Sequence, residues 1–212
     1  LKAEGWRVRY HAFKSDSPIR SLLDFVESQQ QLLPVTELVI THCGEYRLQQ
    51  QIEQYWSQQL QLPVQCLNDE RFFCSLEQFR HWASRYQTLR MEYFYQEMRK
   101  QTGYLMQGQQ PFGEQWNYDS ANRKAWAGNP PLPAPLHFEH DQIDLDVLEL
   151  VEREFSRHSG SLDNFRWGTT RSNALLALEH FITHSLPHFG DYQDAMVQDS
   201  DMLFHSLLSP YL

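Results

Sequence analysis

The sequence has no apolar run near the roughly 20 residues that a helix needs to span a bilayer, and it has few cysteines. Its three cysteines, Cys43, Cys66 and Cys74, are odd in number and lack the close paired spacing of a zinc knuckle or a redox motif. A disulfide framework is therefore disfavoured, and reduced thiols are the simplest interpretation. We expect a soluble, cytoplasmic protein without a membrane segment.

Positive charge is also scarce. The chain of 212 residues carries 18 Lys and Arg against 27 Asp and Glu, a formal net charge of -9. This balance excludes a surface coated in cations for non-specific nucleic-acid binding, but it leaves room for a local basic face. Cations do gather near the middle of the chain, at Arg90, Arg99, Lys100, Arg123 and Lys124. Hydrophobic residues are plentiful at 41%, which is enough for a packed core.

Residues 1 to about 90 alternate between strand and helix patterns. We expect strands at 6–13, 36–42 and 62–68, and amphipathic helices at 17–33, 45–60 and 75–86. Ser17 is the expected N-cap of the first helix, with Pro18 in its first turn. Such strand-helix units predict an α/β fold with a Rossmann-like, mostly parallel sheet and helices on both faces. Three strands make a thin sheet, so we expect it to be incomplete at the N-terminus.

The remaining sequence changes character twice. Residues 101–140 are rich in Gly, Pro, Asn and Gln without a sustained period, which predicts a long ordered connection. Helical periodicity returns from about 143, with Thr170 as the cap of a second helix and Pro187 as its end. The expected division is a partial α/β domain at 1–90, a helix and linker at 91–142, and a helical domain beginning at 143–212.

Four stretches resemble a known family, the photolyase-related proteins of bacteria, which are iron-sulfur bacterial cryptochromes and (6-4) photolyases. These stretches lie at 89–106, 111–124, 165–196 and 203–212. The resemblance implies an α/β antenna-type domain, an interdomain linker and an all-helical domain that binds FAD. It also implies that these residues are a fragment, running from partway through the first domain to the first FAD-contacting turn.

The resemblance gives a cofactor role to "HSLLSPYL" at 205–212. By position, His205 and Ser206 take the place of a Thr-Ser pair that lines the flavin, and Leu208 and Ser209 take the place of the following Leu-Ser. Tyr192 is similar to an aromatic residue near the phosphates. A serine-rich turn that opens a helix offers unpaired N–H donors to a pyrophosphate. Without the resemblance, the two serines would be helix caps and Tyr192 a core aromatic.

A second candidate site lies in the α/β part. His42, Cys43, Gly44 and Glu45 follow a strand and precede a helix, at the edge where α/β sheets usually bind ligands. The resemblance implies a lumazine-type antenna chromophore in this domain. It also implies a 4Fe-4S cluster, which needs four cysteine ligands, so we expect those ligands mostly outside this chain.

Metal sites of other kinds are not indicated. His137, Glu139 and His140 lie in a proline-rich loop and match no helical or knuckle ligand spacing. The acidic run that begins at Asp141 lacks the glycine and the terminal glutamate of a calcium loop. We therefore assign no metal ligand and no catalytic residue within the chain.

The function implied by the resemblance is light-dependent repair of (6-4) pyrimidine photoproducts by a monomeric, FAD-containing lyase. Some of four cations, Arg99, Lys100, Arg123 and Lys124, are expected to border the groove for ultraviolet-damaged DNA, with ordinary surface charge as the alternative for each of them. Two alternatives remain open, because fold alone does not decide function. One is a cryptochrome-like blue-light photoreceptor of the same fold, and the other is a non-enzymatic α/β binding module.

Overall fold

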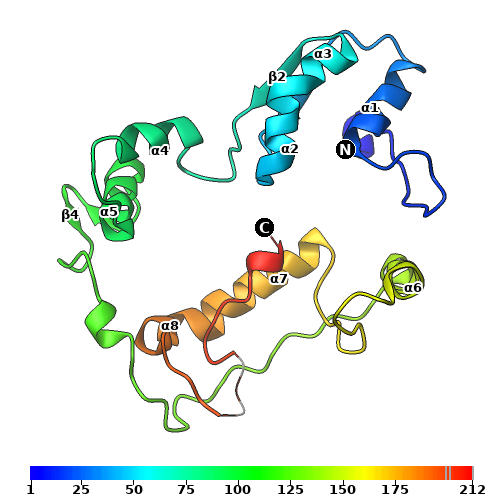
Figure 1. Ribbon diagram of the computed structural model, residues 1–212. Helices are drawn as coiled ribbons and strands as arrows, with labels where there is room; N and C mark the ends of the chain where they lie inside the picture. The colour runs from blue at the N-terminus through cyan, green and yellow to red at the C-terminus, as the bar shows by residue number, and fades with distance from the viewer. Residues whose placement is uncertain (199, 201, 212) are drawn as a thin grey trace. The chain divides into compact units, whose positions relative to one another are not determined.

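The computed structural model of the protein describes residues 1–198, 200 and 202–211, and of residue 121 only the backbone. The chain forms two compact units, Leu1–Phe112 and Gly113–Leu212. The named strands β1 to β4 belong to the first unit and helices α6 to α8 to the second; Figure 1 labels β2, β4 and these three helices. The class is mixed α/β with a small parallel sheet, and the boundary between the units falls inside the segment predicted as a connection.

The first unit is built on one strand-helix-strand repeat. Strand β1 (Leu38–Thr41) pairs in parallel with β2 (Val64–Leu67), with Leu38 opposite Val64. The connection between them is a continuous helix made of α2 (Tyr46–Gln51), the π-helical η2 (Ile52–Trp56) and α3 (Ser57–Leu60). Parallel strands need such a crossover, and the sequence predicted both strands and this helix.

The core of the first unit lies between this helix and the sheet. Its buried members are Ile52, Trp56, Leu60 and Leu62, all no more than 7% exposed. Val64 and the other inward side chains of the strands pack against them. The spacing of four residues between Ile52, Trp56 and Leu60 turns one apolar stripe of the helix toward the sheet, and burial of this stripe stabilises the unit.

Helix α1 (Leu22–Gln30) is shorter than predicted and begins at a different cap. Ser21, and not Ser17, is the N-cap, because its hydroxyl accepts from the Asp24 N–H while the Asp24 carboxylate accepts from the Ser21 N–H. This reciprocal capping box satisfies two helix-end donors at once. Ser17 instead accepts from the N–H of Ile19 in a turn ahead of the helix.

The strand predicted at 6–13 is not formed. Residues Lys2–Glu4 make the short 3-10 helix η1, and the backbone that follows pairs with no strand in the described part of the chain. Tyr10, Trp6 and Phe13 are all exposed there. A β-pattern specifies a strand only where a neighbour can take up its backbone hydrogen bonds, and this stretch has none among the described residues.

The rest of the first unit is helical and aromatic. Helices α4 (Leu76–Ala83) and α5 (Met91–Thr102) are followed by a small hairpin of β3 (Met106–Gln107) and β4 (Gln110–Pro111). Phe79 of α4 meets Phe94 of α5 edge to face with ring centroids 5.2 Å apart, and Trp82 lies 4.9 Å from Phe94. These ring contacts join the two helices.

The second unit begins with the short η3 (Asp119–Ala121) and then carries its helices. They are α6 (Gln142–Phe155), α7 (Arg171–His180), the π-helical η4 (Phe181–Ser185), α8 (Leu186–Tyr192) and the 3-10 turn η5 (Ser209–Tyr211). Thr170 caps α7 as predicted, because its hydroxyl accepts from the N–H of Asn173. None of the helices among the described residues is both long and apolar enough to cross a bilayer.

Pro187 does not end the second helix, contrary to prediction. The helix runs on from α7 through η4 into α8. The π-helical turn resets the hydrogen-bond pattern just ahead of the proline, and Pro187 falls in the first turn of α8. A missing N–H costs least at that position, so the chain remains helical through it.

The core of the first unit generates a stability prediction. Leu60 is 5% exposed at the end of α3, whereas Leu32 is 67% exposed. We expect Leu60→Ala to lower the free energy of unfolding by about 2–5 kcal/mol, because the truncation leaves a cavity. The same truncation at Leu32 should change it by less than about 0.5 kcal/mol. Urea denaturation followed by circular dichroism checks both, and equal losses would contradict this core.

Candidate functional site

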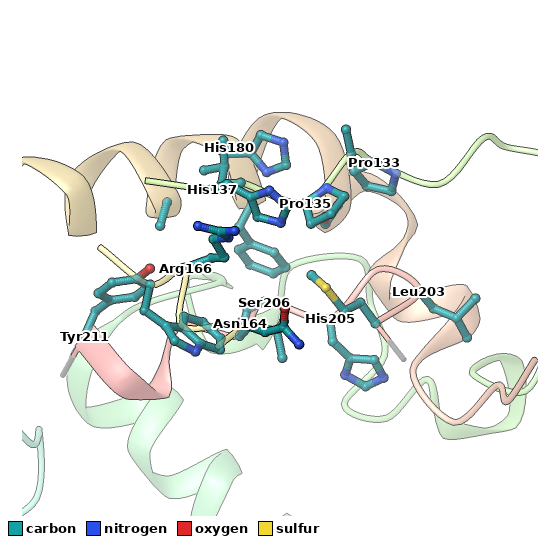
Figure 2. A pocket seen from close by; sticks show the side chains of 18 residues that line it. Pro133, Pro135, His137, Asn164, Arg166, His180, Leu203, His205, Ser206 and Tyr211 are labelled. Atoms are coloured by element: carbon teal, nitrogen blue, oxygen red, sulfur yellow. The ribbon is translucent and has the colours of Figure 1, made fainter. Parts of the chain in front are cut away.

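A cavity of about 220 Å³ lies within the second unit (Figure 2). Four segments line it: residues 133–137, residues 164–167, the end of α7 with η4, and the turn that runs from Met202 to Leu207 together with Tyr211. They are far apart in sequence, so the cavity exists only once the unit is folded. A concave pocket that brings polar groups together is the usual form of a ligand site.

Two of the predicted flavin residues line this cavity and three do not. His205 and Ser206 are part of the wall. Leu208 is half-buried beside it, and the exposed Ser209 opens η5, so a helical turn does begin there. Tyr192 ends α8, where its hydroxyl donates to the Asn129 carbonyl at 3.4 Å.

Phe204 anchors the turn that carries His205 and Ser206. Its side chain is 1% exposed, and its ring centroid lies 5.2 Å from those of both Tyr192 and His188. Leu203 and Leu207 flank the turn with φ of 42° and 48°, in the left-handed region that non-glycine residues rarely adopt. Each such residue costs about 1–3 kcal/mol, which is sustained only where surrounding contacts hold it. Burial of Phe204 is such a contact.

The electrostatics of the cavity are one-sided. Arg166, His137, His180 and His205 belong to its wall, and none of its lining residues among those described carries a carboxylate. In Figure 2 the guanidinium of Arg166 lies below the ring of His137, with His180 beyond. The ring of His205 is turned to the other side, where it meets Phe189 at 5.7 Å. A wall with an arginine and no carboxylate among its described residues favours an anionic ligand.

Backbone contacts hold the loops of the cavity together. The Phe138 N–H donates to the Arg166 carbonyl at 3.2 Å, which joins the loop of His137 to the loop of Arg166. The buried Gly168 donates its N–H to the Tyr211 hydroxyl at 3.2 Å. A Cβ at Gly168 would lie 2.4 Å from the Asn173 Cβ, so only glycine fits where these segments meet. The position of Arg166 is therefore set by three parts of the unit.

The second candidate site is an open pocket in the first unit, at the carboxyl ends of β1 and β2. Of the residues predicted for a ligand site there, His42, Cys43 and Gly44 line this pocket. Glu45 does not line it. Its carboxylate caps α2 by accepting from the Leu48 N–H at 2.6 Å, and it pairs with Arg47 at 2.9 Å.

Two groups that the sequence did not single out complete this open pocket. Asp69 and Arg71 form a close ion pair, and the guanidinium bonded to Asp69 lowers the pKa of that carboxyl to about 2. The pair therefore persists from neutral pH down to the range where that carboxyl takes up its proton. Behind the pocket, the buried Gln49 accepts from the Cys43 N–H at 3.0 Å and so fixes the end of β1.

No metal centre is indicated in the part of the chain that the structure describes, where no three His, Cys, Asp or Glu side chains are placed to share an ion. Cys43, Cys66 and Cys74 are all free thiols in the first unit. Three thiols are one fewer than a cysteine-ligated iron-sulfur cluster requires. The residues present therefore do not fit that group.

The four cations predicted to border DNA have different surroundings. Arg99 is buried, where its guanidinium donates to the Leu105 carbonyl and lies 5.4 Å from the ring of Tyr95, while Lys100 is exposed. In the second unit, Arg123 pairs with Asp194 at 3.3 Å and Lys124 with Asp191 at 2.7 Å. These two ion pairs join the predicted connection, at residues 123 and 124, to the end of α8 and the residues just after it.

The chain thus combines a mixed α/β unit with a helical unit whose cavity wall contains arginine, histidine and aromatic side chains. The family model for deoxyribodipyrimidine photo-lyase-related proteins matches residues 1–167, and the chain belongs to that family. A (6-4) photolyase of Agrobacterium fabrum is 39% identical over 214 residues, covering 100% of this chain and 42% of the relative. The chain thus spans less than half the length of the curated relative that it matches.

The junction at Gly168 generates a matched pair of variants. We expect Gly168→Ala to destabilise the second unit by about 1–3 kcal/mol, because the new methyl group meets Asn173 and Phe138. Gly190→Ala should be neutral or stabilising by up to about 1 kcal/mol, since it lies in α8 with open space around it. Thermal denaturation of both variants tests this, and a stable Gly168→Ala variant would contradict the close approach.

Proposed function

We propose that this chain is part of a light-dependent, FAD-containing lyase that repairs (6-4) pyrimidine photoproducts in DNA. The observation that carries the proposal is the cavity whose described wall includes Arg166, His205 and Ser206 and no carboxylate. Membership of the photolyase-related family supports it, as does the similarity to a (6-4) photolyase. In the proposed assignment, residues 1–90 form part of an antenna-type domain, 91–142 the linker, and 143–212 the start of the FAD domain.

The cavity wall suits one part of a flavin dinucleotide. Ser206 offers a hydroxyl and Arg166 a guanidinium fork for phosphate oxygens, while Trp167 and Tyr211 add aromatic surface to the wall. Tyr192, Leu208 and Ser209 do not line the cavity, and they complete the proposed set of FAD residues. When bound, FAD supplies the electron that light transfers to the lesion. This chain's own residues hold and orient the cofactor.

The first unit suits one further cofactor implied by the family and not another. The open pocket at the ends of β1 and β2 is the proposed place for a lumazine-type antenna, with His42 and Gly44 in its wall and Glu45 fixing the helix behind it. The 4Fe-4S cluster stays outside the proposal, because the cysteines of this chain cannot supply four ligands.

The flavin assignment predicts the effect of a double variant. In the full-length gene product, Ser206→Ala with Ser209→Ala should weaken FAD retention and leave the fold intact, because two small donors are lost without a large cavity. The matched control is Ser156→Ala with Ser159→Ala, at the same spacing in the exposed turn after α6. Flavin absorbance per mole of purified protein is the measurement. Equal flavin content in both double variants would remove these serines from the site.

Repair and DNA binding are tested by separate experiments. Under blue light, the full-length gene product should restore pyrimidines in DNA that carries a (6-4) lesion, and a photoreceptor without repair would leave the lesion in place.

For DNA binding, Lys100, Arg123 and Lys124 are changed together to Gln, and Arg99 is spared because its burial makes it structural.

We expect this triple variant to lower the slope of log affinity against log salt by about 1 for each cation that contacts a phosphate. Neutralising Lys14, Arg47 and Arg153, which are exposed elsewhere, is the control. A slope that stays the same in the triple variant would exclude its cations from the DNA groove.

A further inference from the structure

Arg166 differs from Arg123 and Lys124, the two cations of the second unit that the sequence predicted near DNA. Arg123 and Lys124 are each neutralised by an aspartate. Among the described residues, none forms an ion pair or a hydrogen bond with the guanidinium of Arg166. Its backbone is nevertheless fixed, because its carbonyl accepts from Phe138 and the neighbouring Gly168 is locked against Tyr211. The backbone of Arg166 is therefore fixed, while its guanidinium in the cavity wall has no partner among the described residues. Such a guanidinium can bind a ligand without first breaking an ion pair.

Two imidazoles accompany this guanidinium. His137 comes from the loop that the Phe138 bond ties to Arg166, and His180 comes from the last turn of α7. An imidazole has at least one N–H donor in either protonation state. The lining therefore offers several donors on one side of the cavity and no carboxylate among the described residues to compete for them.

We propose that Arg166, with His137 and His180, forms the subsite that binds the phosphates of the dinucleotide. This inference rests on the proposed function and adds residues that the resemblance did not assign. The planar guanidinium binds two phosphate oxygens at once, which a lysine ammonium cannot do. Ser206 faces the same cavity and supplies a hydroxyl from the opposite segment. The two imidazoles supplement the guanidinium from the loop and from α7.

The test uses the full-length gene product and two flavins that differ in phosphate. FAD carries a pyrophosphate and riboflavin has none, so a phosphate subsite acts on the first alone. We expect Arg166→Met to raise the dissociation constant for FAD roughly tenfold or more and to leave that for riboflavin unchanged. Arg166→Lys should lie between, because it retains the charge and loses the fork. Flavin fluorescence titration gives both constants.

Controls separate the subsite from the fold. Arg157→Met removes an exposed arginine of the same unit that does not line the cavity, and it should bind FAD as the parent does. Arg166 is exposed, so thermal midpoints of all variants should agree. Equal weakening of FAD and riboflavin by Arg166→Met, or no weakening of either, overturns the phosphate subsite while leaving the proposed function in place.

Failure of the proposed function gives a different result. If the parent protein binds no flavin at all, the proposed function is wrong, and inorganic pyrophosphate becomes the probe. Pyrophosphate binding that Arg166→Met abolishes would then support an anion subsite for another ligand. Absence of pyrophosphate binding to the parent would overturn the subsite as well.

Discussion

Burial of the Phe204 ring against Tyr192 and His188 is the interaction on which the candidate site depends. It holds a turn whose flanking leucines have left-handed backbone angles, and this turn presents His205 and Ser206 to the cavity. Tyr192 thereby acquires a second possible role. Its position was predicted to meet a cofactor, and its ring supports the residue at the centre of the turn. Site and core are thus parts of one packing arrangement in the second unit.

The distribution of charge explains how an acidic chain can offer an anion site. The net charge of -9 is spread over a surface where several cations are already paired with carboxylates. The cavity wall is different, because its described residues combine Arg166 and histidines with aromatic rings and no carboxylate. Composition describes the average of the molecule, whereas binding depends on the local arrangement. The same reasoning makes Arg123 and Lys124 weaker candidates for phosphate contacts than an unpaired arginine.

The sequence predicted the parts of the fold that local patterns decide. The β1-helix-β2 repeat and the Thr170 cap follow from apolar spacing and capping chemistry, and both are confirmed. The predictions at 6–13 and at Pro187 are wrong because they depended on a partner strand and on a π-helical turn, neither of which is encoded locally. Arg166 was missed for a related reason. Its neighbours in the cavity, His137, His180 and Ser206, come from three other segments of the chain, and the only local signal was a basic and an aromatic residue ahead of a helix cap.

The central claim is that the cavity of the second unit holds the phosphate end of FAD. A crystal structure of the full-length gene product grown with FAD measures this most directly. The account predicts phosphate oxygens within hydrogen-bonding distance of the Arg166 guanidinium and of the Ser206 hydroxyl. FAD bound with its phosphates away from both residues would contradict it.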